Sequence, residues 1–274
     1  MPGMTSQQTV ALIGLLFSLV SVVLSGWFSV RTAKMGHRLR IEAERRKDEE
    51  TAIKAAEKVY EPLAQAAAEL QSRIYNIVET GWVPLVKRYE SHGDYAVTST
   101  AFLFAHYFGW IEARREAVLS SSGKGRRDES VQQLIDGVTA TLRRSESGDG
   151  FLFFAAEQRA IGELMVSWEF IPDTTTRLPH VDGYAAFVKR YRSDEDFRAW
   201  FAPVDAGMSK VSEGDNRRLI EIQRALVDLI RELDPTNRYT FGYQLEAIDL
   251  SEIGSVAPAE KQPRFPGVSS TTPR

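Results

Sequence analysis

The sequence predicts an all-α protein, in which one N-terminal transmembrane helix continues into a helical stalk and is followed by a multi-helix bundle. Three observations predict this fold class. The first thirty residues carry no charged side chain, a dense basic block follows them, and later apolar residues recur mostly at helical spacing. No two consecutive segments combine polar–apolar alternation with a hairpin turn, so no β-sheet is predicted.

The composition is that of an ordinary globular chain. Of its 274 residues, 43% are hydrophobic and 26% are charged, which excludes collagen-like and wholly disordered proteins. The chain has no cysteine, so structural disulfides, thiolate metal sites and cysteine nucleophiles are excluded. Its four histidines are scattered along the sequence, and we expect neither a metal site nor a cofactor.

The longest apolar segment predicts a transmembrane helix over residues 9–30. From Val10 to Val30 there is no charge, and at a rise of 1.5 Å per residue this run would cover about 32 Å, close to the thickness of bilayer hydrocarbon. Trp27 and Phe28 stand at its basic end, where interfacial aromatic residues are expected. The alternative is a cleaved secretory signal, but the segment lacks a basic n-region and exceeds the usual apolar core of about 7 to 15 residues.

The charge that follows the span predicts its orientation. Between Arg31 and Lys47, seven basic residues stand against two acidic ones, and by the positive-inside rule this flank stays in the cytoplasm. Residues 1–8 would then lie outside the plasma or inner membrane, and the rest of the chain would be cytoplasmic. The same basic residues would also be present if this flank served only to stop transfer of the chain through the membrane, without any specific contact with lipid. The basic side chains nearest the lipid headgroups, which we expect to contact an anionic leaflet, are Arg31, Lys34, Arg38 and Arg40.

One face of the predicted span carries small side chains at helical spacing. These are Gly14, Ser18, Ser21, Ser25 and Ser29. Such a face lets two helices approach closely in lipid, so a homodimer through the span is one interpretation. The other is that each serine bonds back to a carbonyl of its own helix.

Residues 31–61 are predicted to form a basic juxtamembrane helical stalk, because they are rich in Ala, Glu, Lys and Arg. Residues 62–250 are predicted to form a cytoplasmic helical bundle. Capping residues, glycines and prolines bound helices expected over 62–79, 99–120, 130–142, 151–170, 183–190 and 215–233. Gly81 can end the first of these, and Ser130 forms a capping box with Gln133. A second capping box, Ser193 with Asp196, precedes the aromatic run of Phe197, Trp200 and Phe201. The segment 236–254 has the apolar residues to dock on this bundle. The proline-, serine- and threonine-rich residues 255–274 are predicted to form a disordered tail.

The candidate functional residues form one predicted polar cluster, on the 99–120 and 151–170 helices. His106 interrupts an apolar stretch, and Glu157 interrupts an apolar stripe. Because buried polar groups need partners, these two are expected to pair if their helices pack together. The cluster is completed by Gln158 and by an i,i+4 pair of Arg159 with Glu163. It is interpreted either as a core network that sets helix register or as an acid–base or ligand site, and the first is favoured.

Motifs of known chemistry are absent from the sequence. It contains no HExxH, GxSxG or GxGxxG, and the GKG at residues 123–125 lacks the other residues of a phosphate-binding loop. The charge from Asp48 onward sums to −8, which disfavours nucleic acid as a partner. We therefore expect a membrane-anchored scaffold, adaptor or regulatory protein that binds a protein partner. The alternative is a membrane-tethered enzyme or small-molecule sensor with a polar site at His106 and Glu157.

A C-terminal alkaline phosphatase fusion expressed in bacteria tests the predicted orientation. The fused enzyme depends on disulfides that do not form in the cytoplasm, so we expect no phosphatase activity at a fusion level verified by immunoblot. Phosphatase activity, or a mature N-terminus at Gly26, would show that the chain is exported.

Overall fold

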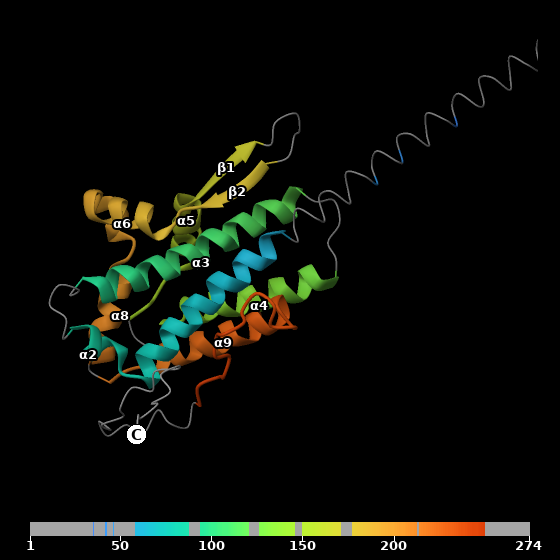
Figure 1. The fold of residues 1–274 in the computed structure, drawn as a ribbon. Coiled ribbons are helices and arrows are strands. Elements are labelled where there is room, and N and C mark those ends of the chain that lie inside the picture. Colours follow the sequence, from blue (N-terminus) through green and yellow to red (C-terminus); the bar gives the residue numbers. More distant parts are fainter. Residues whose placement is uncertain are drawn as a thin grey trace, which may run out of the picture. The chain divides into compact units, whose positions relative to one another are not determined.

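The computed structural model of the chain is shown in Figure 1. It describes residues 35, 42, 46, 58–87, 94–120, 126–145, 150–170, 177–212 and 214–249. The chain divides into two units, Met1–Ala52 and Ile53–Arg274. In the first unit, Met35, Glu42 and Arg46 are helical. The second unit contains all the elements considered below.

Several sequence predictions concern residues outside these ranges. They are the 9–30 span with its small-residue face, the four lipid-contacting basic residues and the 255–274 tail. Within the ranges that the structure describes, no helix combines the length and the apolar character needed to cross a membrane.

The described part of the second unit is mostly helical, in agreement with the predicted fold class. Its longer helices are a helix over 58–79, α3 (Tyr95–Ser120), α4 (Arg126–Leu142), α5 (Ala155–Met165), α8 (Ala202–Ser212) and α9 (Arg217–Leu233). Its shorter helices are α2 (Trp82–Lys87), α6 (Tyr184–Ser193) and α7 (Glu195–Ala199). In Figure 1, α3 runs beside the 58–79 helix, and α4 runs beside α9.

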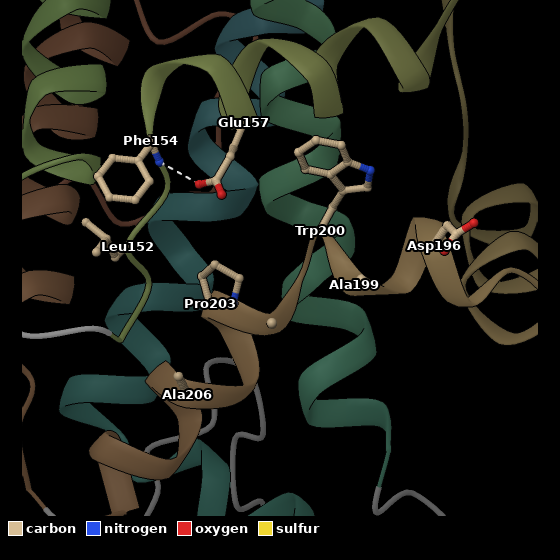
Figure 2. A pocket seen from close by; sticks show the side chains of 9 residues that line it. Leu152, Phe154, Glu157, Asp196, Ala199, Trp200, Pro203 and Ala206 are labelled. Atoms are coloured by element: carbon tan, nitrogen blue, oxygen red, sulfur yellow. Dashed lines mark hydrogen bonds between the residues drawn. The ribbon is translucent and has the colours of Figure 1, made fainter.

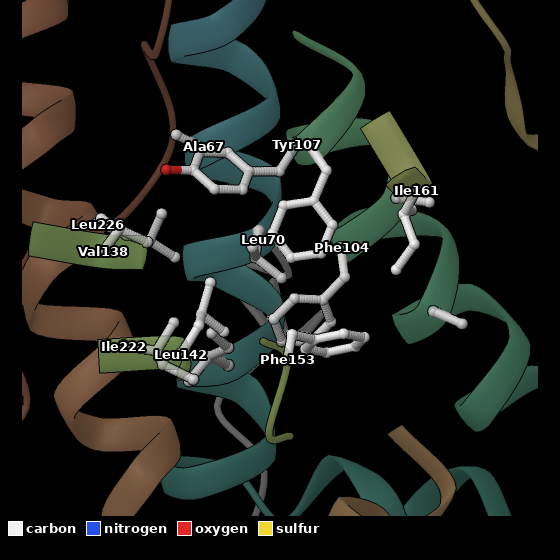
Figure 3. Close-up of a cluster of buried hydrophobic side chains, with 14 of the residues drawn as sticks. Ala67, Leu70, Phe104, Tyr107, Val138, Leu142, Phe153, Ile161, Ile222 and Leu226 are labelled. Atoms are coloured by element: carbon white, nitrogen blue, oxygen red, sulfur yellow. The ribbon is translucent and has the colours of Figure 1, made fainter. Parts of the chain in front are cut away.

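The core is formed where five of these helices meet. Figure 3 shows side chains from the 58–79 helix, α3, α4, α5 and α9, and from the segment that leads into α5, packed against one another. Each is at most 2% exposed: Ala67, Leu70, Phe104, Tyr107, Val138, Leu142, Phe153, Ile161, Ile222 and Leu226. Burial of each larger side chain is worth roughly 1.5 to 3 kcal/mol, so this cluster is the main source of stability.

Helices α3 and α5 approach closely because glycines stand at their contact. A Cβ atom built on Gly162 of α5 would lie 2.6 Å from the carbonyl oxygen of Phe108 on α3. On α3, a Cβ on Gly109 would lie 3.1 Å from the Cβ of Met165 on α5. The backbones therefore pack at a distance that no larger residue would permit.

The residues after α9 form a strap, residues 240–249, which runs back along α9. Two fully buried glutamines bind its backbone: Gln71 donates to the carbonyl of Gln244 at 3.0 Å, and Gln223 accepts the N–H of Ile248 at 3.0 Å. The docking anticipated for the segment after 236 is thus confirmed as far as residue 249. The strap also contacts α9 through Arg231, which donates to the carbonyl of Leu245.

A buried aspartate turns the chain from α9 into the strap. Asp234 accepts the backbone N–H groups of Arg238, Tyr239 and Thr240 and the hydroxyl of Thr240, all at 2.8 to 2.9 Å. Burial alone would raise the pKa of this carboxyl, but the hydrogen bonds together hold its pKa below the usual value. The ionised carboxylate therefore stabilises this turn down to a lower pH than a free aspartate would.

The predicted 151–170 helix is wrong at both ends. Helix α5 ends at Met165, and β1 (Val166–Phe170) follows and pairs antiparallel with β2 (Arg177–Val181). Residues 166, 168 and 170 are Val, Trp and Phe, which favour strands and alternate with the polar residues 167 and 169. The fold is therefore mostly helical with one two-stranded hairpin, and the expectation of no β-sheet is corrected.

Several predicted helix boundaries also change. The first bundle helix does not begin at Pro62, because the chain is already helical at residue 58, and its end at Gly81 is confirmed by the positive φ of 63° there. Helix α4 begins at Arg126, so Ser130 is not its cap and instead donates to Glu232 at 2.5 Å. Helices α2 and α8 were not predicted.

The two glycines Gly162 and Gly137 provide a matched test of the α3–α5 contact. We expect Gly162→Ala to lower the free energy of unfolding by about 1 to 3 kcal/mol, because the methyl group has no room. Nothing lies within 4 Å of a Cβ at Gly137 of α4, so Gly137→Ala should raise it by about 0.5 to 1 kcal/mol through helix propensity. Chemical denaturation of the full chain measures both values. Equal effects of the two substitutions would contradict the close approach.

Candidate functional site

An open groove lies between the N-terminal end of α5 and the α7–α8 pair (Figure 2). Its volume is about 680 Å³. Two of the residues that line it are acidic and the others are apolar: Leu152, Phe154, Glu157, Asp196, Ala199, Trp200, Ala202, Pro203 and Ala206. We call this the acidic groove.

The first wall of the acidic groove is the extended segment before α5. Its side chains alternate in burial: Phe151 and Phe153 are at most 2% exposed, while Phe154 is 55% exposed and Leu152 is half-buried. After Phe151, whose φ is positive, this is the two-residue period of extended backbone, which directs alternate side chains to opposite faces. Burying Phe151 and Phe153 in the core therefore directs Leu152 and Phe154 into the groove.

Backbone hydrogen bonds hold this wall in place. The N–H of Phe151 donates to the carbonyl of Pro203 at 2.8 Å, and the N–H of Phe153 donates to the carbonyl of Leu142 at 3.0 Å. Phe151 has a positive φ of 54°, a strained value for a bulky residue. Its ring would collide with any side chain at Gly207, where a Cβ would lie 2.3 Å from ring carbons.

The second wall is carried by α7 and by the start of α8. Asp194 caps α7 by accepting the N–H of Phe197 at 2.9 Å, one residue away from the predicted capping position at Ser193. Phe197 and Phe201 are buried, and their rings pack at 5.2 to 5.6 Å from the ring of Phe187 on α6. These buried rings leave the intervening Trp200 37% exposed. Figure 2 shows it standing between the two acidic side chains of the groove.

Charge in the acidic groove has a single sign. Glu157 and Asp196 are the ionisable lining residues, and among the nine lining residues there is no serine, threonine, lysine, histidine or tyrosine to act as a nucleophile or a cation. Glu157 is also engaged structurally, because its carboxylate accepts the N–H of Phe154 at 2.7 Å. The groove therefore offers aromatic surface and negative charge, which suit binding of a basic apolar segment better than bond-breaking chemistry.

The predicted polar cluster is not brought together. On α3, His106 faces the 58–79 helix: its Nδ1 lies 3.7 Å from Oε2 of Glu69, and its Nε2 accepts the indole N–H of Trp110 at 3.1 Å. The ring of Phe102 stacks on it at 5.1 Å. Glu157, by contrast, lines the acidic groove. The expected pairing of His106 with Glu157 was wrong because α3 contacts α5 through the face around Phe108, about 200° from His106 around the helix.

The other members of the cluster have separate roles. Gln158 is buried and donates to the carbonyls of Phe153 at 2.9 Å and Thr139 at 3.3 Å, so it ties α5 to α4. Arg159 and Glu163 form the predicted i,i+4 pair, with 2.9 Å between Nε and Oε1. Both side chains are more than half exposed, so the pair adds little stability.

Most residues of the acidic groove were missed by sequence reasoning. The predicted 151–170 helix would place Phe154 on its apolar stripe, and the aromatic run that contains Trp200 does not indicate which of its side chains are exposed. Residues 151–154 are Phe, Leu, Phe and Phe, so no polar–apolar alternation in the sequence distinguishes the exposed positions from the buried ones. Within the described ranges, no group of three or more acidic or histidine side chains is arranged to hold a metal ion.

Comparison with protein-family models, curated proteins and solved structures finds no match to this chain.

Substitutions of Glu157 distinguish a cap from a catalytic group. Gln retains an oxygen acceptor for the Phe154 N–H, so Glu157→Gln should change the free energy of unfolding by less than about 0.5 kcal/mol. Glu157→Leu loses the acceptor and should cost about 1 kcal/mol. Chemical denaturation measures both, with Glu163→Gln on the exposed face as the control. If Glu157→Leu is as stable as the parent, the carboxylate does not cap α5.

Proposed function

We propose that this protein is a membrane-anchored helical adaptor that binds a basic, apolar segment of a partner protein in the acidic groove. The observation that supports the proposal is the exposure of two large aromatic side chains, Phe154 at 55% and Trp200 at 37%, in a concave site flanked by carboxylates. Aromatic side chains of this kind contribute most of the binding energy in many protein interfaces.

The rigid support of the groove favours binding. Phe154 follows a segment fixed by backbone hydrogen bonds, and Trp200 follows a helix packed on buried rings. Little conformational entropy is therefore lost when a partner covers these side chains. The two carboxylates attract a cationic segment and disfavour an acidic one, which gives the site selectivity.

Membrane anchoring belongs to the same proposal and is supported by the sequence alone. The uncharged 9–30 segment would span the bilayer, and the basic residues after it would contact anionic lipid and keep the bundle in the cytoplasm. The small-residue face of the span would bring two copies together. In this arrangement the groove captures its partner at the membrane surface. A site at His106 and Glu157 has no support, because the two residues have different partners.

Selection from a phage-displayed library of random twelve-residue peptides, against the full chain in phospholipid nanodiscs, tests the groove as a binding site. We expect enriched peptides to combine Arg or Lys with proline, leucine or aromatic residues. Synthetic versions should bind Trp200→Ala at least about tenfold more weakly than the parent, the loss typical of an interface hot spot.

The matched control for this experiment is Phe241→Ala, which removes an aromatic side chain that is 85% exposed and does not line the groove. Its affinity for the same peptides should equal that of the parent chain. Peptides that bind Trp200→Ala and the parent equally, or a library that yields no binder, would overturn the proposed function.

A further inference from the structure

We propose that residues 261–266 of this chain, which read KQPRFP, occupy the acidic groove in cis and compete there with the partner segment. This inference rests on the proposed function, because it takes the groove to be a binding site. It identifies an occupant by its chemistry and adds regulation of the site by the protein's own C-terminal region.

The segment has the chemistry that the acidic groove selects. Lys261 and Arg264 are cationic, and from residue 261 to residue 274 there is no acidic residue. Phe265 is the one aromatic residue in the sequence after residue 250. Glu157 and Asp196 provide the opposite charge, since both acidic residues of the groove are without a basic neighbour among the residues that line it.

The prolines of the segment match the aromatic surface. Pro263 and Pro266 are three residues apart, the spacing at which prolines of an extended polyproline helix lie on one face. Such segments dock in grooves lined with aromatic side chains and lose little entropy on binding, because proline already restricts φ. Trp200 and Phe154 supply the exposed rings.

The strap leads the chain toward the end of α9 that lies near the acidic groove. Contacts of the strap pass from Arg231 near the end of α9 to Gln223 and Arg224 nearer its start, so the strap runs toward the N-terminal end of α9. One turn further along α9, Arg218 and Leu219 border the small cavity that Phe151 and Gly207 also line. Phe151 and Gly207 are in turn the chain neighbours of Leu152 and Ala206, which line the acidic groove.

The length of the connection is sufficient. Arg264 lies fifteen positions after Asp249, and this stretch spans up to about 50 Å when extended. A folded unit of about 200 residues has a radius of gyration of roughly 16 Å, so this reach exceeds its diameter. Attachment in cis also gives the segment a high effective concentration at the groove, so that a weak contact suffices for occupancy.

The natural absence of cysteine allows a direct test by disulfide trapping in the full chain. The variant carries Ala206→Cys in the groove and Gln262→Cys in the segment, and the control pairs Gln262→Cys with Ala186→Cys on the exposed face of α6. Under mild oxidation in nanodiscs, we expect the groove pair to form an intramolecular disulfide at least about tenfold faster than the control pair, as measured by mass spectrometry of the linked peptides.

Charge reversal shows whether complementarity drives the contact. Asp196→Lys or Arg264→Glu, each added to the groove pair, should slow trapping, and the two together should restore it. Arg264→Glu alone should also strengthen binding of the selected library peptides severalfold, because it frees the groove. Three outcomes would each overturn the proposal. They are disulfide formation at the control rate, a rate that does not change on charge reversal, and a disulfide-linked dimer in place of the intramolecular product.

The two proposals fail separately. Library peptides that need Trp200, without charge-dependent trapping, would leave the partner-binding function standing and remove the segment as occupant. Charge-dependent trapping without any groove-dependent library peptide would show that the groove serves the chain's own segment, and the adaptor function would be rejected.

Discussion

The contact between Phe151 and Gly207 is the constraint on which the candidate site depends. The phenyl ring lies where any side chain at 207 would stand, and the backbone of Phe151 adopts a positive φ to place it there. This single contact fixes α8 against the segment that enters α5, and the hydrogen bond from Phe151 to Pro203 reinforces it. The register of the next three residues follows, with Phe153 in the core and Phe154 at the surface. A strained residue at such a junction is tolerated because the surrounding packing determines its conformation.

The proposed function, an adaptor held at a membrane, requires only modest affinity from the acidic groove. Its apolar surface is small, so a short segment bound there would dissociate readily, and specificity would come from the sign of the charge. Anchoring at a membrane raises the effective concentration of any partner confined to the same surface, and it does so without additional contacts. Modest affinity in the groove is therefore compatible with stable association at the bilayer and with rapid exchange away from it.

The sequence was most informative where a single helix face is apolar. Helix α9 was predicted over 215–233 and is found at Arg217–Leu233, because its apolar residues repeat at helical spacing and Pro235 follows. Helix α8 was missed because its small residues and Gly207 give a weak pattern. The hairpin was missed because the apolar residues of α5 run directly into those of β1, and periodicity over so few residues does not separate helix from strand.

The candidate site was harder to predict than the fold, because it depends on which faces meet. The helical pattern placed His106 on an apolar helix, but it did not indicate whether that face would meet α5 or the 58–79 helix. In the folded protein this face meets the 58–79 helix, where His106 contacts Glu69. Trp200 gains its exposure from Phe197 and Phe201, which turn toward α6 and are buried there. Such outcomes depend on residues far apart in the sequence, and a local pattern does not contain them.

A hydrogen bond to the strap joins parts of the chain that are synthesised at different times. Gln71 is fully buried in the finished protein, yet its bond to the carbonyl of Gln244 joins residues 173 positions apart. At a translation rate of about 5 to 20 residues per second, roughly 10 to 35 s pass between the appearance of the two. Until residue 244 has been made, the buried amide of Gln71 lacks this partner. The last described residues thus complete the hydrogen bonding of a buried side chain, although they contribute no helix or strand.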